Sequence, residues 1–365
     1  MIARLEVTNF KAFRELDLSL RRLTVLAGLN SAGKSTVIQS LILAQLAGQA
    51  EGGVPLNGPF GLALGEASDV IHSQADEGAV IRFVLSGPQG RELIELSAPD
   101  YRAVVLDRVG YESAAGTAAV RDGHIGAYLG AERLGPRDLL DIGSAVADPP
   151  SVGHQGQFSA HVLVQLERHP VRQELLHPST GHEGLPRTFL HQTQAWLSLV
   201  VRPVQVEATW LLQANAATVR FRPPGLASGW MRPANVGFGI SYALPIIVAG
   251  LSCLPGSLLM VENPEAHLHP AGQSAIGRFL ARVAAAGVQT IVETHSDHVL
   301  NGIRLAIAQE EALGAADTVI HFFGAATRPV EIDIVSSGAL TAWPSGFFDQ
   351  SELDLGNIAR IGRRG

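Results

Sequence analysis

Gly28-Leu29-Asn30-Ser31-Ala32-Gly33-Lys34-Ser35-Thr36 follows an apolar run and opens a segment with helical periodicity. The run Leu23–Ala27 predicts a strand, and the residues from Lys34 to about Leu46 predict a helix. The quoted residues match G-x-x-x-x-G-K-[ST], a pattern that requires this strand-to-helix context. We therefore interpret them as a phosphate-binding loop rather than as a chance glycine-rich turn.

The residue types of this loop suit a nucleotide. Glycines let the backbone curl so that successive N–H groups face the β-phosphate, with the positive end of the helix behind them. Lys34 would bridge the β- and γ-phosphates, and the Ser35 hydroxyl would ligate Mg²⁺. The sequence thus predicts ATP and Mg²⁺ as ligands. The predicted nucleotide-binding residues of the loop are Asn30, Ser31, Ala32, Gly33, Lys34, Ser35 and Thr36.

The end of a second apolar strand supplies a carboxylate. Leu258-Leu259-Met260-Val261 runs into Glu262, and ligands of open α/β sheets collect at the carboxyl ends of strands. Glu262 would hold the Mg²⁺ shell through water. Asn263 takes the place where related ATPases carry the glutamate that orients the attacking water, and Glu265 is the next carboxylate available. In the alternative interpretation, Glu262 only caps the helix that follows Pro264.

The strand predicted at Gln289–Glu293 ends in a similar polar cluster, in which His295 would sense the γ-phosphate. Histidines near both strand ends also allow a zinc site built from four imidazoles. That alternative uses His267, His269, His295 and His298. We favour the nucleotide interpretation because two of these histidines lie in a turn before Pro270 and because each cluster already has a place in the nucleotide site.

The composition excludes several classes of protein. With 365 residues, 46% hydrophobic and 17% charged, the chain is a folded globular protein long enough for a large α/β domain with an insertion. A formal net charge of −7 gives no overall attraction for polyanions, so charge does not imply nucleic acid. The single cysteine, Cys253, excludes an intramolecular disulfide and suits the cytoplasm.

No membrane or export segment is predicted. Met1–Asn9 alternates polar and apolar residues and predicts a first strand rather than a signal peptide. Pro233–Val261 carries no charge, but glycines and prolines interrupt it. We therefore expect a buried helix, a turn and a buried strand there instead of a membrane span.

The order of the expected elements favours a largely parallel sheet with helices on both faces. Strands are expected at Ile2–Thr8, Leu16–Leu20, Val80–Leu85, Glu92–Ser97, Ser257–Val261, Gln289–Glu293, Thr318–Phe323 and Val330–Val335. Helices are expected at Ser241–Leu251, Gly272–Ala285 and His298–Leu313, with helical pieces near Gln165–Leu176 and Thr193–Val200. We divide the chain into an N-terminal ATPase lobe (1–98), an inserted helical subdomain (99–225), a C-terminal lobe (226–335) and a tail (336–365).

Three segments together resemble the ABC-type ATPases of the SMC and OLD-like group. They are Glu6-Val7-Thr8-Asn9-Phe10-Lys11-Ala12-Phe13, the phosphate loop, and Glu262-Asn263-Pro264-Glu265-Ala266-His267-Leu268-His269-Pro270. Residues 128–137, 236–245 and 343–350 resemble more narrowly a bacterial subfamily of AAA proteins whose C-terminal tail has no assigned function. The resemblance implies an α/β fold, an ABC-type P-loop NTPase head with a mixed, largely parallel sheet flanked by helices and an inserted subdomain.

The resemblance also implies a homodimer with two nucleotides at its interface. Gly237, Gly239 and Ser241 stand where the signature motif lies and would contact the γ-phosphate held by the other subunit's Lys34. They depart from the Leu-Ser-Gly-Gly-Gln of transporters. We expect no nuclease domain, because only about seventy residues follow His295 without a convincing set of acidic ligands.

The leading functional hypothesis is an ATP-driven dimerisation switch that hydrolyses ATP slowly and controls a protein partner or effector, in antiphage defence by analogy with such families. Hydrolysis is expected to be slow because the amide of Asn263 cannot accept a proton from water, unless Glu265 or Glu293 does so. Two alternatives stay open: an ATP-gated DNA-associated clamp like SMC heads, and a nucleotide-bound scaffold without turnover.

Overall fold

The computed structural model describes residues 1–113, 125–143, 150–225, 229–309, 313–325 and 328–362. At its centre is a six-stranded sheet with the order β15-β14-β3-β13-β12-β8. Its strands are β3 (Leu23–Gly28), β8 (Ile125–Leu129), β12 (Leu258–Glu262), β13 (Gln289–Glu293), β14 (Thr318–Phe323) and β15 (Val330–Asp333). Every neighbouring pair is parallel except β14 with β15. The predicted α/β architecture is confirmed.

A second six-stranded sheet is antiparallel and has the order β2-β1-β5-β6-β7-β4. Its strands are β1 (Arg4–Phe10), β2 (Phe13–Ser19), β4 (Gly53–Pro55), β5 (Ile81–Gly87), β6 (Gly90–Ser97) and β7 (Val105–Ser113). The short helix α2 (Ala67–Val70) lies beside it. Strands were predicted for β1, β2, β5 and β6, but not for β4 and β7.

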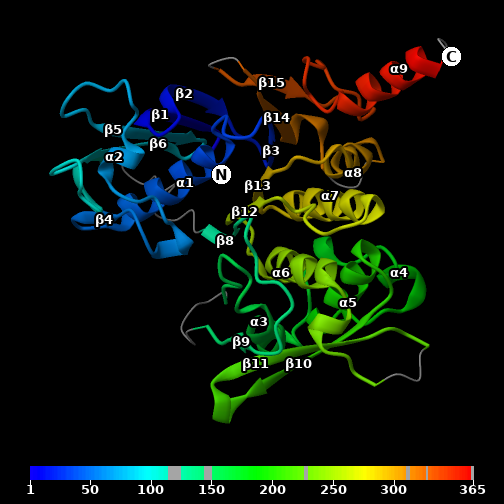
Figure 1. Cartoon of the computed structure of the whole chain (residues 1–365). Coiled ribbons are helices and arrows are strands. Elements are labelled where there is room, and N and C mark those ends of the chain that lie inside the picture. The colour runs from blue at the N-terminus through cyan, green and yellow to red at the C-terminus, as the bar shows by residue number, and fades with distance from the viewer. Residues whose placement is uncertain (114–124, 144–149, 226–228, 310–312, 326–327, 363–365) are drawn as a thin grey trace.

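Helix α1 (Lys34–Gln49) packs between the two sheets (Figure 1). It is buried on nearly all sides, as expected for a helix whose apolar residues do not form one stripe. One core cluster joins its side chains to the antiparallel sheet and to Met260 and Ile291 of the central sheet. Leu259 and Val261 point into the opposite cluster, because successive side chains of a strand alternate between faces.

The other face of the central sheet is covered by α6 (Phe238–Ser252), α7 (Pro270–Ala285) and α8 (Asp297–Ala308), shown in Figure 1. Glycines bring α7 and α8 into close contact. A Cβ on Gly277 would lie 2.2 Å from the Val299 carbonyl oxygen, and one on Gly302 would lie 2.0 Å from that of Ser274. The predicted helices are confirmed here, although α8 ends at Ala308; residues 310–312 of that prediction lie outside the described residues.

A smaller subdomain packs below and beside α6 in Figure 1. It contains a three-stranded antiparallel sheet and three helices. These are β9 (Leu140–Asp141), β10 (Gln205–Leu211), β11 (Ala216–Arg222), α3 (Ser159–Leu166), α4 (Thr180–Glu183) and α5 (Phe189–Val200). The helical pieces expected near Gln165–Leu176 are found in part, as the end of α3 at Leu166 and a short 3₁₀ turn, Gln173–Leu175, after Pro170. The helix expected at Thr193–Val200 is confirmed as part of α5.

The last helix of the described residues is α9 (Gln350–Gly362), which projects from the body (Figure 1). Before it, Phe347 is fully buried and its ring lies 5.3 Å from that of Phe322 in β14. Within the ranges given above, no helix combines the length and apolar character that a membrane crossing requires.

Candidate functional site

The loop between β3 and α1 has the backbone shape that its glycines predict. Gly28 and Gly33 have φ angles of 133° and 103°, which side chains larger than hydrogen rarely allow. A Cβ on Gly28 would lie 2.1 Å from the Phe323 carbonyl oxygen. Glycines at both ends of the loop therefore allow its backbone conformation, and Gly28 also allows the close approach to β14.

Lys34 lies inside this loop rather than in solvent. Its side chain is 3% exposed, and its Nζ donates to the carbonyl oxygens of Gly28 at 3.1 Å and Leu29 at 2.6 Å. Burial lowers its pKa, while the nearby Glu293 carboxylate, 4.0 Å from Nζ, opposes that shift. The ammonium is thus held in the loop, where a phosphate would meet it.

Glu293, at the end of β13, is the carboxylate that faces the loop. Ser35 Oγ donates to its Oε2 at 2.9 Å. Burial raises the pKa of Glu293 to about 7, the charge of Glu262 adds to that shift, and Ser35 and Lys34 oppose it. A carboxylate with such a pKa changes charge close to neutral pH.

Glu262, at the end of β12, is directly opposite Glu293 in the sheet register. Its carboxylate accepts from the Tyr128 hydroxyl at 2.9 Å and from the Ala131 N–H at 3.3 Å. Burial raises its pKa, and the hydrogen bonds from Tyr128 and Ala131 and the charge of Arg133 oppose this shift. Glu262 is therefore held by Tyr128 of β8 and by Ala131 of the segment that follows β8.

Arg133 supports the backbone beneath this carboxylate. It is 2% exposed and donates to the carbonyl oxygens of Glu262 and Asn263, each at 2.6 Å, and to that of Gly130 at 2.9 Å. Asn263 has a φ of 44°, and its N–H donates to the Glu293 carbonyl oxygen at 2.8 Å. The turn after β12 is thus tied to both neighbouring strands.

Glu265 ties the same turn to the loop after β13. Its two oxygens accept from Thr294 Oγ1 and from the His295 N–H, both at 2.7 Å. The pKa of His295 is lowered by burial and by the charge of Lys34. A neutral imidazole near the phosphate loop can donate a hydrogen bond to a phosphate oxygen from one nitrogen.

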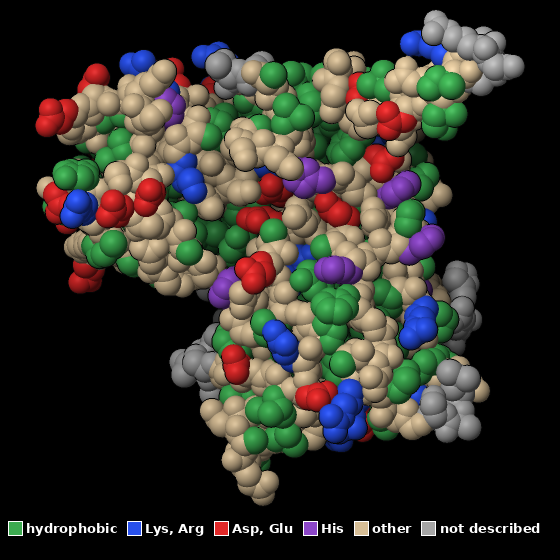
Figure 2. All heavy atoms as spheres, in the orientation of Figure 1, with side chains coloured by type: hydrophobic (Ala, Val, Ile, Leu, Met, Phe, Trp, Pro, Cys, Tyr) green, Lys and Arg blue, Asp and Glu red, His purple; other side chains and the backbone are tan. Residues whose placement is uncertain are grey.

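The predicted residues thus fall into two groups. Lys34, Ser35, Glu262, Glu265 and His295 come together around the carboxyl ends of β3, β12 and β13. In Figure 2, acidic and histidine side chains gather in the hollow at the middle of the view, over these strand ends. Within the described chain, no hydrogen bond joins Gly237, Gly239 or Ser241 to the phosphate loop.

Those three residues form the start of α6. Gly237 has a φ of 96° and precedes the helix, and a Cβ on Gly239 would lie 2.7 Å from the His267 carbonyl oxygen. The His267 ring lies 5.3 Å from the Phe238 ring and 4.5 Å from that of Tyr242. Since the described residues contain no group of three or more potential metal-binding side chains, the zinc alternative has no structural support.

Sequence reasoning missed Tyr128 and Arg133 as partners of the acidic strand end and named Glu293 only as a substitute base. The sequence could have identified Glu293, because it is the last residue of a predicted strand, Gln289–Glu293. The structure places this strand next to the one that ends at Glu262. Tyr128 opens the segment 128–137 that carries the family resemblance, but no sequence signal paired it with Glu262, which lies 134 positions away.

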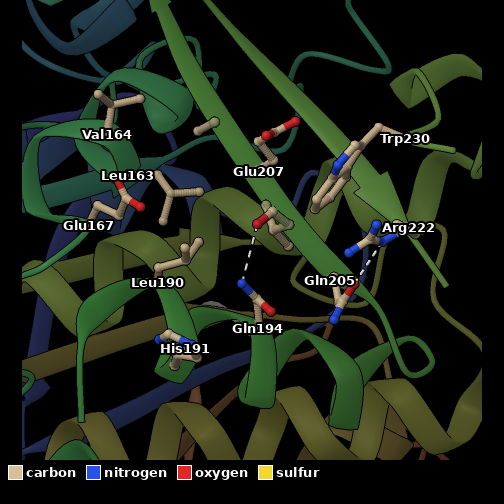
Figure 3. A pocket seen from close by; sticks show the side chains of 12 residues that line it. Leu163, Val164, Glu167, Leu190, His191, Gln194, Gln205, Glu207, Arg222 and Trp230 are labelled. Carbon is tan, nitrogen blue, oxygen red and sulfur yellow. Dashed lines mark hydrogen bonds between the residues drawn. The ribbon is translucent and has the colours of Figure 1, made fainter. Parts of the chain in front are cut away.

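A separate cavity lies in the subdomain (Figure 3), with a volume of about 290 Å³ between α3, α5 and β10. Arg222 lies 4.6 Å from the Trp230 ring centre and donates to Gln205 at 2.8 Å, while Gln194 donates to the Val206 carbonyl oxygen. No residue predicted for the nucleotide site lines this cavity.

Comparison with known families identifies the chain. The family described as "AAA domain, putative AbiEii toxin, Type IV TA system" matches residues 23–301, which is more than half of the chain, so the chain belongs to this family. The family "Protein of unknown function (DUF3696)" matches residues 314–358. These matches confirm the predicted relationship to AAA-type P-loop ATPases with a C-terminal tail of unassigned function. A search of curated proteins found no significant match.

Among solved structures, the chain is similar to an Smc head bound to the C-winged helix domain of ScpA, with a TM-score of 0.50, 12% identity, and coverage of 96% of this chain and 99% of that one. It is also similar to the SMC head domain from Thermotoga maritima, with a TM-score of 0.42, 13% identity, and coverage of 94% and 98%. The first likeness concerns the fold alone and confirms the predicted head-like α/β fold.

Proposed function

We propose that this member of the AAA family binds ATP and Mg²⁺ at the loop Gly28–Thr36 and hydrolyses the ATP slowly in a homodimer that holds two nucleotides at its interface. One observation carries most weight. The loop hydroxyl of Ser35 and the ammonium of Lys34 both lie next to the buried Glu293 carboxylate. A phosphate-binding loop with an ionisable carboxylate at its inner side is an arrangement suited to phosphoryl transfer to water.

Each predicted residue has a proposed role in binding. The N–H groups of the loop would surround the β-phosphate, and Lys34 would bridge the β- and γ-phosphates. Ser35 and Glu262 would hold Mg²⁺, Ser35 directly and Glu262 through water; the ion, when bound, would neutralise phosphate charge. His295 would donate to the γ-phosphate. The loop residues proposed for binding are Asn30, Ser31, Ala32, Gly33, Lys34, Ser35 and Thr36.

Glu293 is the proposed general base. Asn263 cannot accept a proton, and Glu265 is hydrogen-bonded to Thr294 and His295 of the loop after β13 rather than to the phosphate loop. Glu293 faces the phosphate loop, and its pKa of about 7 leaves much of it ionised at neutral pH. Water would attack the γ-phosphorus, the bond to the β–γ bridging oxygen would break, and the proton of the water would pass to Glu293.

The homodimer would complete each site. Gly237, Gly239 and Ser241 stand at the start of α6, whose N-terminal end favours an anion. We propose that they contact the γ-phosphate bound by the second copy. ATP would then hold two heads together, and hydrolysis would release them, so that a protein partner or effector reads the state of the dimer. The toxin named in the family description supports a defence setting.

We also propose the division of the chain into residues 1–98, 99–225, 226–335 and 336–365. Within it, β8 belongs to the second part by sequence yet pairs with β12 in the central sheet. Tyr128 in this strand brings the insertion to the acidic strand end, which would let the subdomain respond to the nucleotide.

The test compares wild type with Lys34→Ala, Glu262→Gln and Glu293→Gln by phosphate release and by molecular mass, each with and without ATP and Mg²⁺. We expect loss of turnover in all three variants, and an ATP-dependent dimer that persists in Glu262→Gln but not in Lys34→Ala. Binding and dimerisation without turnover in wild type would favour the scaffold. Absence of both turnover and any change in mass would refute the switch.

The DNA-clamp alternative draws on the similarity in fold to Smc heads. It predicts that the closed dimer binds duplex DNA with an affinity that falls steeply between 50 and 200 mM salt, on the order of 10³-fold if about six phosphates are contacted. The net charge of −7 argues against it. An electrophoretic shift that depends on ATP and is lost in Lys34→Ala would favour the clamp.

A further inference from the structure

The tail before α9 is packed against the nucleotide-binding lobe. Phe347 is fully buried, with its ring 5.3 Å from Phe322, 5.2 Å from Trp343 and 4.8 Å from Phe348. Asp349 Oδ2 accepts from the Gly346 N–H at 2.9 Å and closes the turn. The segment 343–350 is therefore packed against the nucleotide-binding lobe in a defined conformation.

This segment forms one wall of a cavity beside the phosphate loop. Gly28, Leu29, His295 and Phe322 also line the cavity, which has a volume of about 290 Å³. Of the tail's two phenylalanines at this cavity, Phe348 is partly accessible and Phe347 is fully buried, while Gln350 lies at the start of α9. For comparison, a dry cavity of about 150 Å³ already accommodates benzene. The space is thus ample for one aromatic ring.

An aromatic ring is exposed at the start of α6. Phe238 is 54% exposed and lies between Gly237 and Gly239 of the proposed signature segment. Its ring contacts the His267 ring at 5.3 Å, and a Cβ on Gly135 would lie 3.0 Å from it. A single exposed apolar side chain is ordinary. The notable features are that this ring is supported by its neighbours and stands three residues before Ser241.

We propose that Phe238 of one copy enters the cavity beside the phosphate loop of a second copy, so that the tail segment 343–350 is part of the dimer interface. This inference rests on the proposed function, in which Ser241 meets the γ-phosphate of the other subunit. The cavity borders the residues around that phosphate, Leu29 and His295, and Phe238 neighbours Ser241. When Ser241 of one copy contacts the γ-phosphate bound by the other copy, Phe238, three residues before Ser241, comes to the cavity beside that phosphate.

The interface would depend strongly on this ring. Aromatic anchors that fill pockets near the centre of an interface commonly dominate its affinity. Phe238→Ala is expected to raise the protein concentration needed for ATP-dependent dimerisation about tenfold or more. Leu254→Ala is the matched control, because Leu254 is 50% exposed but follows the opposite end of α6. It is expected to leave dimerisation unchanged.

A cross-linking experiment tests the contact directly. The single native cysteine, Cys253, is buried and is replaced by alanine, and cysteines are introduced by Phe238→Cys and Gln350→Cys. A short bismaleimide is then added with or without a non-hydrolysable ATP analogue and Mg²⁺. We expect a covalent dimer only with the analogue, loss of that dimer with Lys34→Ala added, and none for Leu254→Cys paired with Gln350→Cys.

The outcomes separate this inference from the proposed function. If the protein dimerises with the analogue but the Phe238→Cys, Gln350→Cys pair cross-links no better than the Leu254 control, the inference is wrong and the dimer stands. If light scattering shows a monomer under all conditions, the proposed function fails and the inference fails with it. Cross-linking that requires the analogue, together with weaker dimerisation of Phe238→Ala, supports both.

Discussion

Glu262 and Glu293 are opposite each other on adjacent parallel strands, yet their side chains have different surroundings. Glu262 accepts hydrogen bonds from Tyr128 of β8 and from Ala131 of the segment that follows it. Glu293 accepts from Ser35 of the phosphate loop and lies 4.0 Å from the Lys34 ammonium. Two carboxylates in equivalent strand positions can thus serve different purposes, because the segments that cross the strand ends differ.

The comparison assigns a proposed role to each carboxylate. A group held by a tyrosine hydroxyl and a backbone N–H is oriented to hold an ion shell, whereas one that faces the phosphate loop with a pKa near 7 is suited to take a proton.

The largest effect is expected for Glu293→Gln. Removal of a general base commonly lowers turnover by about 10²–10⁴-fold, and we expect a loss in this range with ATP-dependent dimerisation retained. Phosphate release in single-turnover conditions measures it, with equilibrium nucleotide binding as the control. A residual rate within a few-fold of wild type would mean that another group acts as the general base.

Replacement of Arg133 is expected to disturb the surroundings of Glu262 and to leave those of Glu293 unchanged. Arg133→Met leaves the carbonyl oxygens of Glu262 and Asn263 without their donor and removes a cation near a buried carboxylate. We expect the free energy of unfolding to fall by about 3–5 kcal/mol. Chemical denaturation measures this loss. Arg232→Met, which removes a surface ion pair with Asp138, is the control and is expected to change stability by less than about 1 kcal/mol.

The pH dependence of stability tests the raised pKa of Glu293. Burial raises the pKa of Glu293 from 4.5 to about 7, so between these values the folded chain retains a proton that the unfolded chain has lost. Stability therefore falls as pH rises through this window, by up to about 3 kcal/mol from this group. Thermal unfolding without nucleotide at pH 5 and pH 8 measures it. In Glu293→Gln the loss of stability between pH 5 and pH 8 is expected to be smaller. An unchanged loss would show that Glu293 is not its source.

The smallest effect is expected for Tyr128→Phe. The variant removes the hydroxyl that donates to Glu262 and leaves the ring in place. We expect a loss of about 1–2 kcal/mol in the free energy of unfolding and a higher Mg²⁺ concentration for half-maximal turnover. Titration of Mg²⁺ against phosphate release checks the second part. Tyr242→Phe is the control, since its ring, rather than its hydroxyl, contacts His267.

Much of this protein could be predicted from local sequence. The phosphate loop, the strand that ends at Glu262 and the helix behind Ser241 each depend on contiguous residues, and their backbone conformations follow from glycine positions and apolar periodicity. The family relationship and the α/β fold, predicted on these features, are confirmed. The roles of the individual site residues stay predictions.

Only the tertiary structure decided which side chains meet. The Tyr128 contact with Glu262 spans 134 positions and that of Ser35 with Glu293 spans 258, and sheet order and crossover paths determine both. The tail is a further case, since burial of Phe347 against Phe322 brings Gln350 to a cavity shared with Leu29. Local periodicity specifies which face of an element is buried, but it does not specify the partner, because many apolar faces fit one another until the whole chain is packed.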